Sequence, residues 1–150
     1  MELVSIIGSV VLGLVIGSFL NVLIYRLPRG LGFTKGRSFC PKCRHKINWF
    51  DNVPLLSFVV LGGKCRYCRK SISWQYPLVE LATALLTVLI INYQFSRLIG
   101  GQAIFSFFLS LFLTWGLVVI FVIDLEHQII PDEILIFLTV LFLVSYLGLN

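Results

Sequence analysis

The chain alternates long apolar runs with short polar segments. The runs over 3–25 and 98–123 contain no charged residue, the run over 76–95 contains only Glu80, and the run over 134–150 is again uncharged. About 20 consecutive apolar residues are enough for a helix to cross a bilayer. Each run therefore predicts one membrane-spanning helix, and we expect an all-α polytopic membrane protein with about four transmembrane helices.

The composition agrees with this fold class. Hydrophobic residues make up 58% of the 150 positions and the mean hydropathy is +0.96, which excludes an ordinary soluble domain. The first apolar run follows an acidic residue, Glu2, where a signal peptide has basic ones, and no small-residue cleavage site comes after it. We expect it to be a retained first helix in the lipid bilayer.

The net charge of +5 is concentrated in one segment, because eleven of the twelve Lys and Arg residues lie within 26–70. Short loops rich in these residues stay in the cytoplasm, and nothing else in the chain resembles a nucleic-acid-binding fold. The charge therefore predicts membrane topology, and no nucleic-acid partner is expected.

The expected domains are a first transmembrane helix over 1–25, a cytoplasmic basic loop over 26–75, and the remaining helices over 76–150. With the loop inside, the N-terminus and the connection around Arg97 lie outside. The third helix then runs inward, and Asp124 at its end lies on the same cytoplasmic side as the loop.

The basic loop contains two CxxC pairs separated by 21 residues: Cys40, Cys43, Cys65 and Cys68. Two such pairs can complete a tetrahedral zinc site of the zinc-ribbon kind. Two disulfides are the alternative, but disulfides rarely persist in the cytoplasm. We expect structural zinc, since four cysteines leave no position for a reactive water. His45 could replace one of the cysteines as a ligand, but a position beside the site or at the surface is favoured.

The segment 50–61 between the two pairs is mostly apolar but too short to cross a bilayer. Pro54 would interrupt a helix here. We expect this segment to lie in the membrane interface, so that the zinc loop rests beside the helix ends.

Three polar residues stand near the predicted inner ends of successive helices: Asn21, Glu80 and Asp124. Ionisable groups in membrane spans usually face the bundle interior. Each also has a structural explanation, because Asn21 can bond between helices, Glu80 can lie among headgroups and Asp124 can end its helix. Asp132, which follows a proline, is better explained as a helix cap.

The chain resembles the type IV prepilin peptidases, also called leader peptidase/N-methyltransferases, over nearly its whole length. The resemblance is carried by the stretches GSFLNVLIYRLP (17–28), CPKCRHKINWFDNVPLLSF (40–58), GKCRYC (63–68), ISWQYPLVELATALL (72–86) and IDLEHQIIPD (123–132). One departure is Gln75, at a position where the family pattern has an arginine.

The resemblance implies an intramembrane aspartic protease of the bacterial inner membrane. Such enzymes cut the basic leader from prepilins and pseudopilins of type IV pili and type II secretion, before a phenylalanine, and many then methylate the new amine with S-adenosylmethionine. It implies that Asp124 is the first catalytic aspartate. Asn21 and Glu80, which are expected at the same level of the membrane, are then candidate neighbours of the site. Two carboxylates that share a proton can act as acid and base on a water.

The family's second aspartate belongs to a GxGD motif, which residues 1–150 do not contain. The sequence therefore resembles an N-terminal part of the enzyme, or one that a second polypeptide completes. The alternative is a non-proteolytic membrane adaptor or decayed remnant with a zinc loop. A variant that only methylates lies between the two, although no glycine-rich nucleotide loop is present.

Overall fold

The computed structural model describes residues 3–32, 37–95 and 101–149. Its elements are the helices α1 (Leu3–Arg26), α2 (Leu56–Val60), α3 (Gln75–Phe95), α4 (Gly101–His127) and α5 (Asp132–Leu149), with 3₁₀ turns at Leu27–Arg29 and Trp49–Asn52. The described residues form no strand beyond two isolated bridges. The expected all-α fold is confirmed. The connection around Arg97 lies outside the described residues.

Three stretches are helical, long and apolar enough to cross a membrane: Leu3–Arg29, Gln75–Gln94 and Ile104–His127. The fourth expected span corresponds to α5, whose last side chains lie outside the described part, so the number four stays a prediction. Large apolar side chains such as Leu85, Phe121 and Ile136 point outward. Lipid tails would cover this surface.

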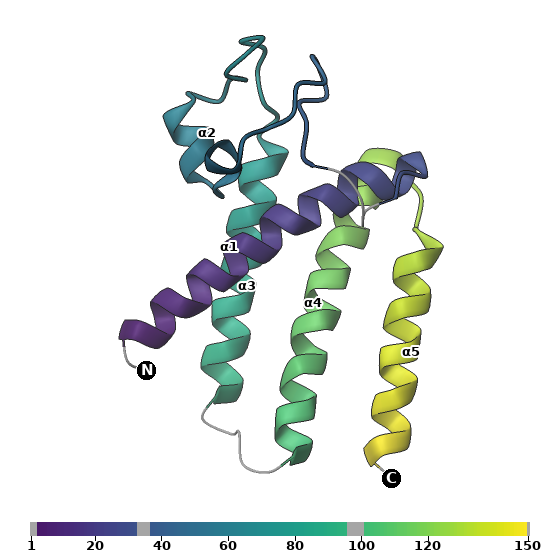
Figure 1. Cartoon of the computed structure of the whole chain (residues 1–150). Coiled ribbons are helices and arrows are strands. Elements are labelled where there is room, and N and C mark those ends of the chain that lie inside the picture. The colour runs from purple at the N-terminus through teal and green to yellow at the C-terminus, as the bar shows by residue number, and fades with distance from the viewer. Residues whose placement is uncertain (1–2, 33–36, 96–100, 150) are drawn as a thin grey trace.

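Figure 1 shows α3, α4 and α5 running side by side, while α1 crosses α3 obliquely. The same view places the cysteine loop over the beginning of α3, at the end of the bundle where the α4–α5 turn also lies. The loop and the end of α4 therefore share one end of the bundle, as the topology argument expected.

Glycines allow α1 and α3 to pack closely. A Cβ atom added to Gly13 would lie 2.5 Å from Cα of Ala84, and one added to Gly17 would lie 2.7 Å from Cα of Glu80. Real Cβ atoms essentially never come so near. Small residues spaced by four therefore set the distance between these two helices, as is common in membranes.

The buried core joins all four long helices at the end of the bundle that carries the loop. It contains Leu20 and Ile24 of α1, Val79 of α3, Val119 and Ile123 of α4, and Ile134 of α5. Farther along, Trp115 of α4 donates a hydrogen bond from Nε1 to Oγ1 of the buried Thr87, at 3.0 Å. This core fixes the helix ends on which the candidate site is built.

Candidate functional site

The two CxxC pairs form turns with the same backbone hydrogen bonds. In the first, Cys40 N–H donates to the His45 carbonyl and Arg44 N–H to the Cys40 carbonyl; in the second, Cys65 N–H donates to Lys70 and Arg69 N–H to Cys65. Arg44 and Arg69 both adopt a positive φ, near 59° and 57°. The two halves of the loop are thus repeats of one turn, each presenting two thiols on one side.

The four sulfur atoms lie within 4.8 Å of one another, and those of Cys40 and Cys68 are 4.0 Å apart. A disulfide needs about 2.05 Å, and the four cysteines are free. Tetrahedral zinc with Zn–S bonds of about 2.3 Å separates its sulfurs by about 3.8 Å. The thiols therefore fit a zinc ion after a small contraction. Among the described residues they are the one group of three or more potential metal ligands.

The thiols have unequal proton affinities. Backbone hydrogen bonding at Cys68 lowers the pKa of Cys65 to about 7, against burial, with further help from the Tyr67 backbone. A hydrogen bond with the His45 backbone lowers the pKa of Cys43, but desolvation and the three other thiols together raise this pKa to about 11. Crowded thiols cannot all ionise unaided, and a bound divalent cation would supply the missing positive charge.

Side-chain contacts join the two halves of the loop. Arg66 donates to both carboxylate oxygens of Asp51, with the closest N···O distance 2.6 Å. His45 stacks on Tyr67, whose hydroxyl accepts a hydrogen bond from Asn48 at 2.9 Å. His45 thus lies beside the cysteine group and stacks on the second cysteine turn.

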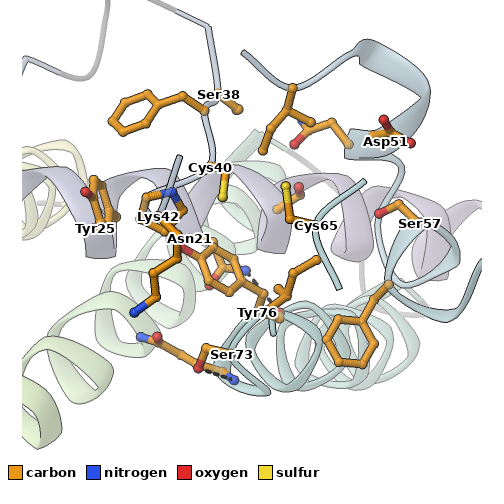
Figure 2. Close-up of a pocket in the computed structure, with 18 of the residues that line it drawn as sticks. Asn21, Tyr25, Ser38, Cys40, Lys42, Asp51, Ser57, Cys65, Ser73 and Tyr76 are labelled. Carbon is orange, nitrogen blue, oxygen red and sulfur yellow. Dashed lines mark hydrogen bonds between the residues drawn. The ribbon is translucent and has the colours of Figure 1, made fainter. Parts of the chain in front are cut away.

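A cavity of about 640 Å³ lies beneath the cysteine loop. Its walls come from the end of α1, both cysteine turns, α2 and the beginning of α3, with Glu126 as the contribution of α4. Figure 2 shows Cys40 and Cys65 near each other above Asn21 and Tyr76. The structure therefore brings Asn21 and Glu80 to one cavity with the cysteines.

Asn21 and Glu80 each bind backbone across this region. Asn21 donates from Nδ2 to the Tyr76 carbonyl at 3.1 Å, which joins α1 to α3. The Oε2 atom of Glu80 accepts the backbone N–H of Leu55 at 2.8 Å, which joins α3 to the loop. Both side chains are buried, at 5% and 7% exposure.

Leu55 has an unusual backbone. Its φ is 56° and ψ is −47°, and the next residue, Leu56, donates its N–H to the Pro54 carbonyl. This is a γ-turn of the rare form, which is strained for a residue with a Cβ atom. The turn aims the Leu55 N–H at Glu80, and Pro54 interrupts the segment as expected, with a 3₁₀ turn before it and α2 after it.

Asp124 has different surroundings. Its side chain is exposed, it does not line the cavity, and its carboxylate has no hydrogen bond or ion pair within the described residues. Oε2 of Glu126 lies 3.9 Å from Nε2 of the adjacent His127. Among the described residues, these two side chains form no metal-ligand group with Asp124. The structure thus separates Asp124 from Asn21 and Glu80, which the sequence had grouped in one layer.

Asp132 is the first residue of α5, and its carboxylate has no hydrogen bond in the described part of the chain. The predicted N-cap role of Asp132 is therefore wrong, because this residue lies inside the helix and its side chain accepts no backbone N–H in the described part of the chain. Asp132 and Glu133 both stand in the first turn, where a negative charge interacts favourably with the helix dipole.

Sequence reasoning missed the Asp51–Arg66 pair and the strained turn at Leu55. Asp51 is the sole acidic residue within 26–75, and this isolation among basic residues was a usable signal. The turn at Leu55 had no signal in the sequence, because leucine ordinarily avoids a positive φ.

Comparisons with known proteins agree on one family. Residues 11–94 match the family model described as the bacterial peptidase A24 N-terminal domain. The protein named prepilin leader peptidase/N-methyltransferase from Pseudomonas aeruginosa is 36% identical, over 89% of this chain and 52% of its own length. The relative with the same name from Vibrio cholerae is 49% identical, over 55% of this chain and 36% of its own length. The one from Myxococcus xanthus is 43% identical, over 81% of this chain and 34% of its own length.

The chain spans about half the length, or less, of these curated relatives. No solved structure matches it.

Proposed function

Since the chain belongs to the family of bacterial prepilin leader peptidases/N-methyltransferases, we propose that it forms the zinc loop and the first catalytic aspartate of an enzyme that removes the leader from prepilins and pseudopilins. The enzyme is an aspartic endopeptidase that cuts before a phenylalanine. Support for this comes from the names of the relatives and from the position of Asp124 at the end of an apolar helix.

In this proposal Asp124 acts on a water together with a second carboxylate. One of the two is protonated and the other is not, so that they serve as acid and base. The second aspartate is supplied from outside residues 1–150, by further chain or by a second polypeptide. The exposure of Asp124, with no partner for its carboxylate in the described part, leaves room for that group.

The membrane sides follow from charge. We place the basic loop and Asp124 in the cytoplasm and the N-terminus outside the inner membrane, because eleven of twelve Lys and Arg residues lie within 26–70. A basic leader then reaches Asp124 from the cytoplasm, and the apolar part of the prepilin packs among the spans.

The relatives' name also includes an N-methyltransferase activity. The cavity is the observation that favours this activity here. Four cysteines hold zinc as a structural ion at its roof, and about 640 Å³ suits a cofactor of drug-like size. We assign S-adenosylmethionine to this cavity, where it supplies the methyl group when bound. Tyr25, Tyr67 and Tyr76 line the walls and offer aromatic surface for an adenine ring.

The test of Asp124 uses the complete enzyme in native membranes and follows the shortening of a prepilin substrate on a gel. Asp124→Asn should abolish leader removal and leave the zinc content unchanged, whereas Asp132→Asn, a matched change a short distance away on α5, should cleave normally. Normal cleavage by Asp124→Asn would contradict the catalytic assignment.

The non-proteolytic adaptor remains the second candidate, and the exposed, unbonded carboxylate of Asp124 is the observation in its favour. It predicts that Asp124→Asn changes nothing, while loss of a cysteine still destabilises the loop. The same pair of variants therefore distinguishes the two functions.

A further inference from the structure

Glu80 is a buried carboxylate without a cation. Its side chain is 7% exposed, and no Lys, Arg or His lies within ion-pair distance of it among the described residues. Its Oε2 atom accepts a hydrogen bond from the neutral N–H of Leu55. An ionised carboxylate that is removed from water needs a compensating charge. In a membrane span, such a group indicates a functional site.

The other acids of the cavity are compensated differently. Asp51 is neutralised by Arg66 through a two-point ion pair. Glu126 is exposed at the end of α4, where water solvates it, and His127 lies 3.9 Å away. Glu80 is thus the acid of the cavity that combines burial with the lack of a cationic partner in the described residues.

The groups next to the Glu80 carboxylate are neutral donors. The Leu55 N–H occupies Oε2, at 2.8 Å, and the Ser18 side chain lies close to the carboxylate. Asn21 lines the same cavity. Glu80 stands five residues into α3, about 7.5 Å from the helix start at a rise of 1.5 Å per residue. Because Glu80 is 7% exposed, a ligand group has to be small to reach it.

We propose that Glu80 binds the free α-ammonium group of a peptide, namely the N-terminus that leader removal creates. This inference rests on the proposed function, because that reaction is what releases a new amine. Glu126 of α4 lines the cavity, and α4 also carries Asp124, so the helix of the proposed catalytic aspartate borders the cavity that contains Glu80. A charge-assisted hydrogen bond in a desolvated site holds it there.

The test is a binding experiment with the zinc-loaded protein in lipid nanodiscs, with no methyl donor present. The probes are three synthetic peptides of one apolar sequence that begins with phenylalanine: one with a free N-terminus, one N-acetylated, and one N-acetylated with a lysine at its end. The free peptide should bind about 10-fold or more tightly than the acetylated one, the scale of a hydrogen bond to a charged group.

Two variants assign the preference to the carboxylate. Glu80→Gln keeps an oxygen for the Leu55 N–H, so the loop should hold its zinc while the preference for the free amine disappears. Glu126→Gln, the matched change at the exposed acid of the cavity, should keep the preference. Zinc content is measured on each variant.

Three results would overturn the proposal: equal binding of the free and acetylated peptides by the unmodified protein, an undiminished preference in zinc-loaded Glu80→Gln, or equally tight binding of the acetylated lysine peptide. The last would identify Glu80 as a site for the basic leader. The first needs no variant, so a Glu80→Gln protein that fails to fold leaves the proposal testable. Because no cleavage is involved, the outcome is separate from that of Asp124→Asn.

Discussion

Glu80 and Asp124 are both carboxylates near the end of an apolar helix, yet they lie in opposite surroundings. Glu80 is buried under the cysteine loop, and its carboxylate accepts a hydrogen bond from Leu55. Asp124 is exposed at the end of α4 and has no side-chain bond in the described residues. A position near the predicted inner end of a helix thus does not decide how a polar residue is used.

The difference lies in what each helix packs against. α3 is held against α1 through glycine contacts and is covered by the loop, which encloses Glu80. The family model matches residues 11–94, a range that contains the loop and Glu80 and ends before Asp124. The surroundings of Glu80 are therefore built within the matched domain, whereas Asp124 lies outside it.

Substitution of a cysteine should have the largest effect, and this effect should be confined to the cysteine loop around Glu80. Cys65→Ser should reduce bound zinc from about one ion per chain to none and unfold the loop, since structural zinc contributes about 10–16 kcal/mol in small domains. Zinc analysis and limited proteolysis within 37–73 measure this. Asp124→Asn is the control and should retain its zinc. A protease-resistant loop in zinc-free Cys65→Ser would show that packing alone holds it.

A bulky residue between α1 and α3 should have the next largest effect. Gly17→Leu forces atoms against Glu80, where even a Cβ would lie 2.7 Å from Cα, and overpacking of this kind costs about 1–3 kcal/mol. Unfolding in detergent, followed by tryptophan fluorescence, measures the loss. Gly8→Leu is the matched control, because no atom lies within 4 Å of a Cβ there. Equal stability of the two variants would contradict the close helix contact.

Relief of the strained turn should give the smallest change. Leu55→Gly keeps the N–H that Glu80 accepts and removes the Cβ penalty at φ 56°. The free energy of unfolding should rise by at most about 1 kcal/mol. Leu56→Gly, in the adjacent helical position of α2, should lower it by about 0.5–1 kcal/mol. Changes of the same sign in both variants would show that the turn at Leu55 is not strained.

The apolar runs and the paired cysteines were readable from the sequence because each depends on neighbours in the chain. Helix α1 ends at Arg26, where Pro28 and the left-handed Gly30 follow, and the two CxxC turns close on themselves with local hydrogen bonds. The membrane fold, the four-cysteine cluster and the family are thus confirmed predictions. The membrane sides, the role of Asp124 and the bound cofactors stay predictions.

What the sequence by itself determined is therefore the long apolar helices and the four-cysteine cluster. Only the tertiary structure decided that Glu80 and Asn21 share a cavity while Asp124 stands apart, and that Leu55 adopts a strained turn toward Glu80. The reason is physical: burial of a polar residue depends on which distant segments cover it, and residues 53–60 reach Glu80 only because the loop folds back over α3.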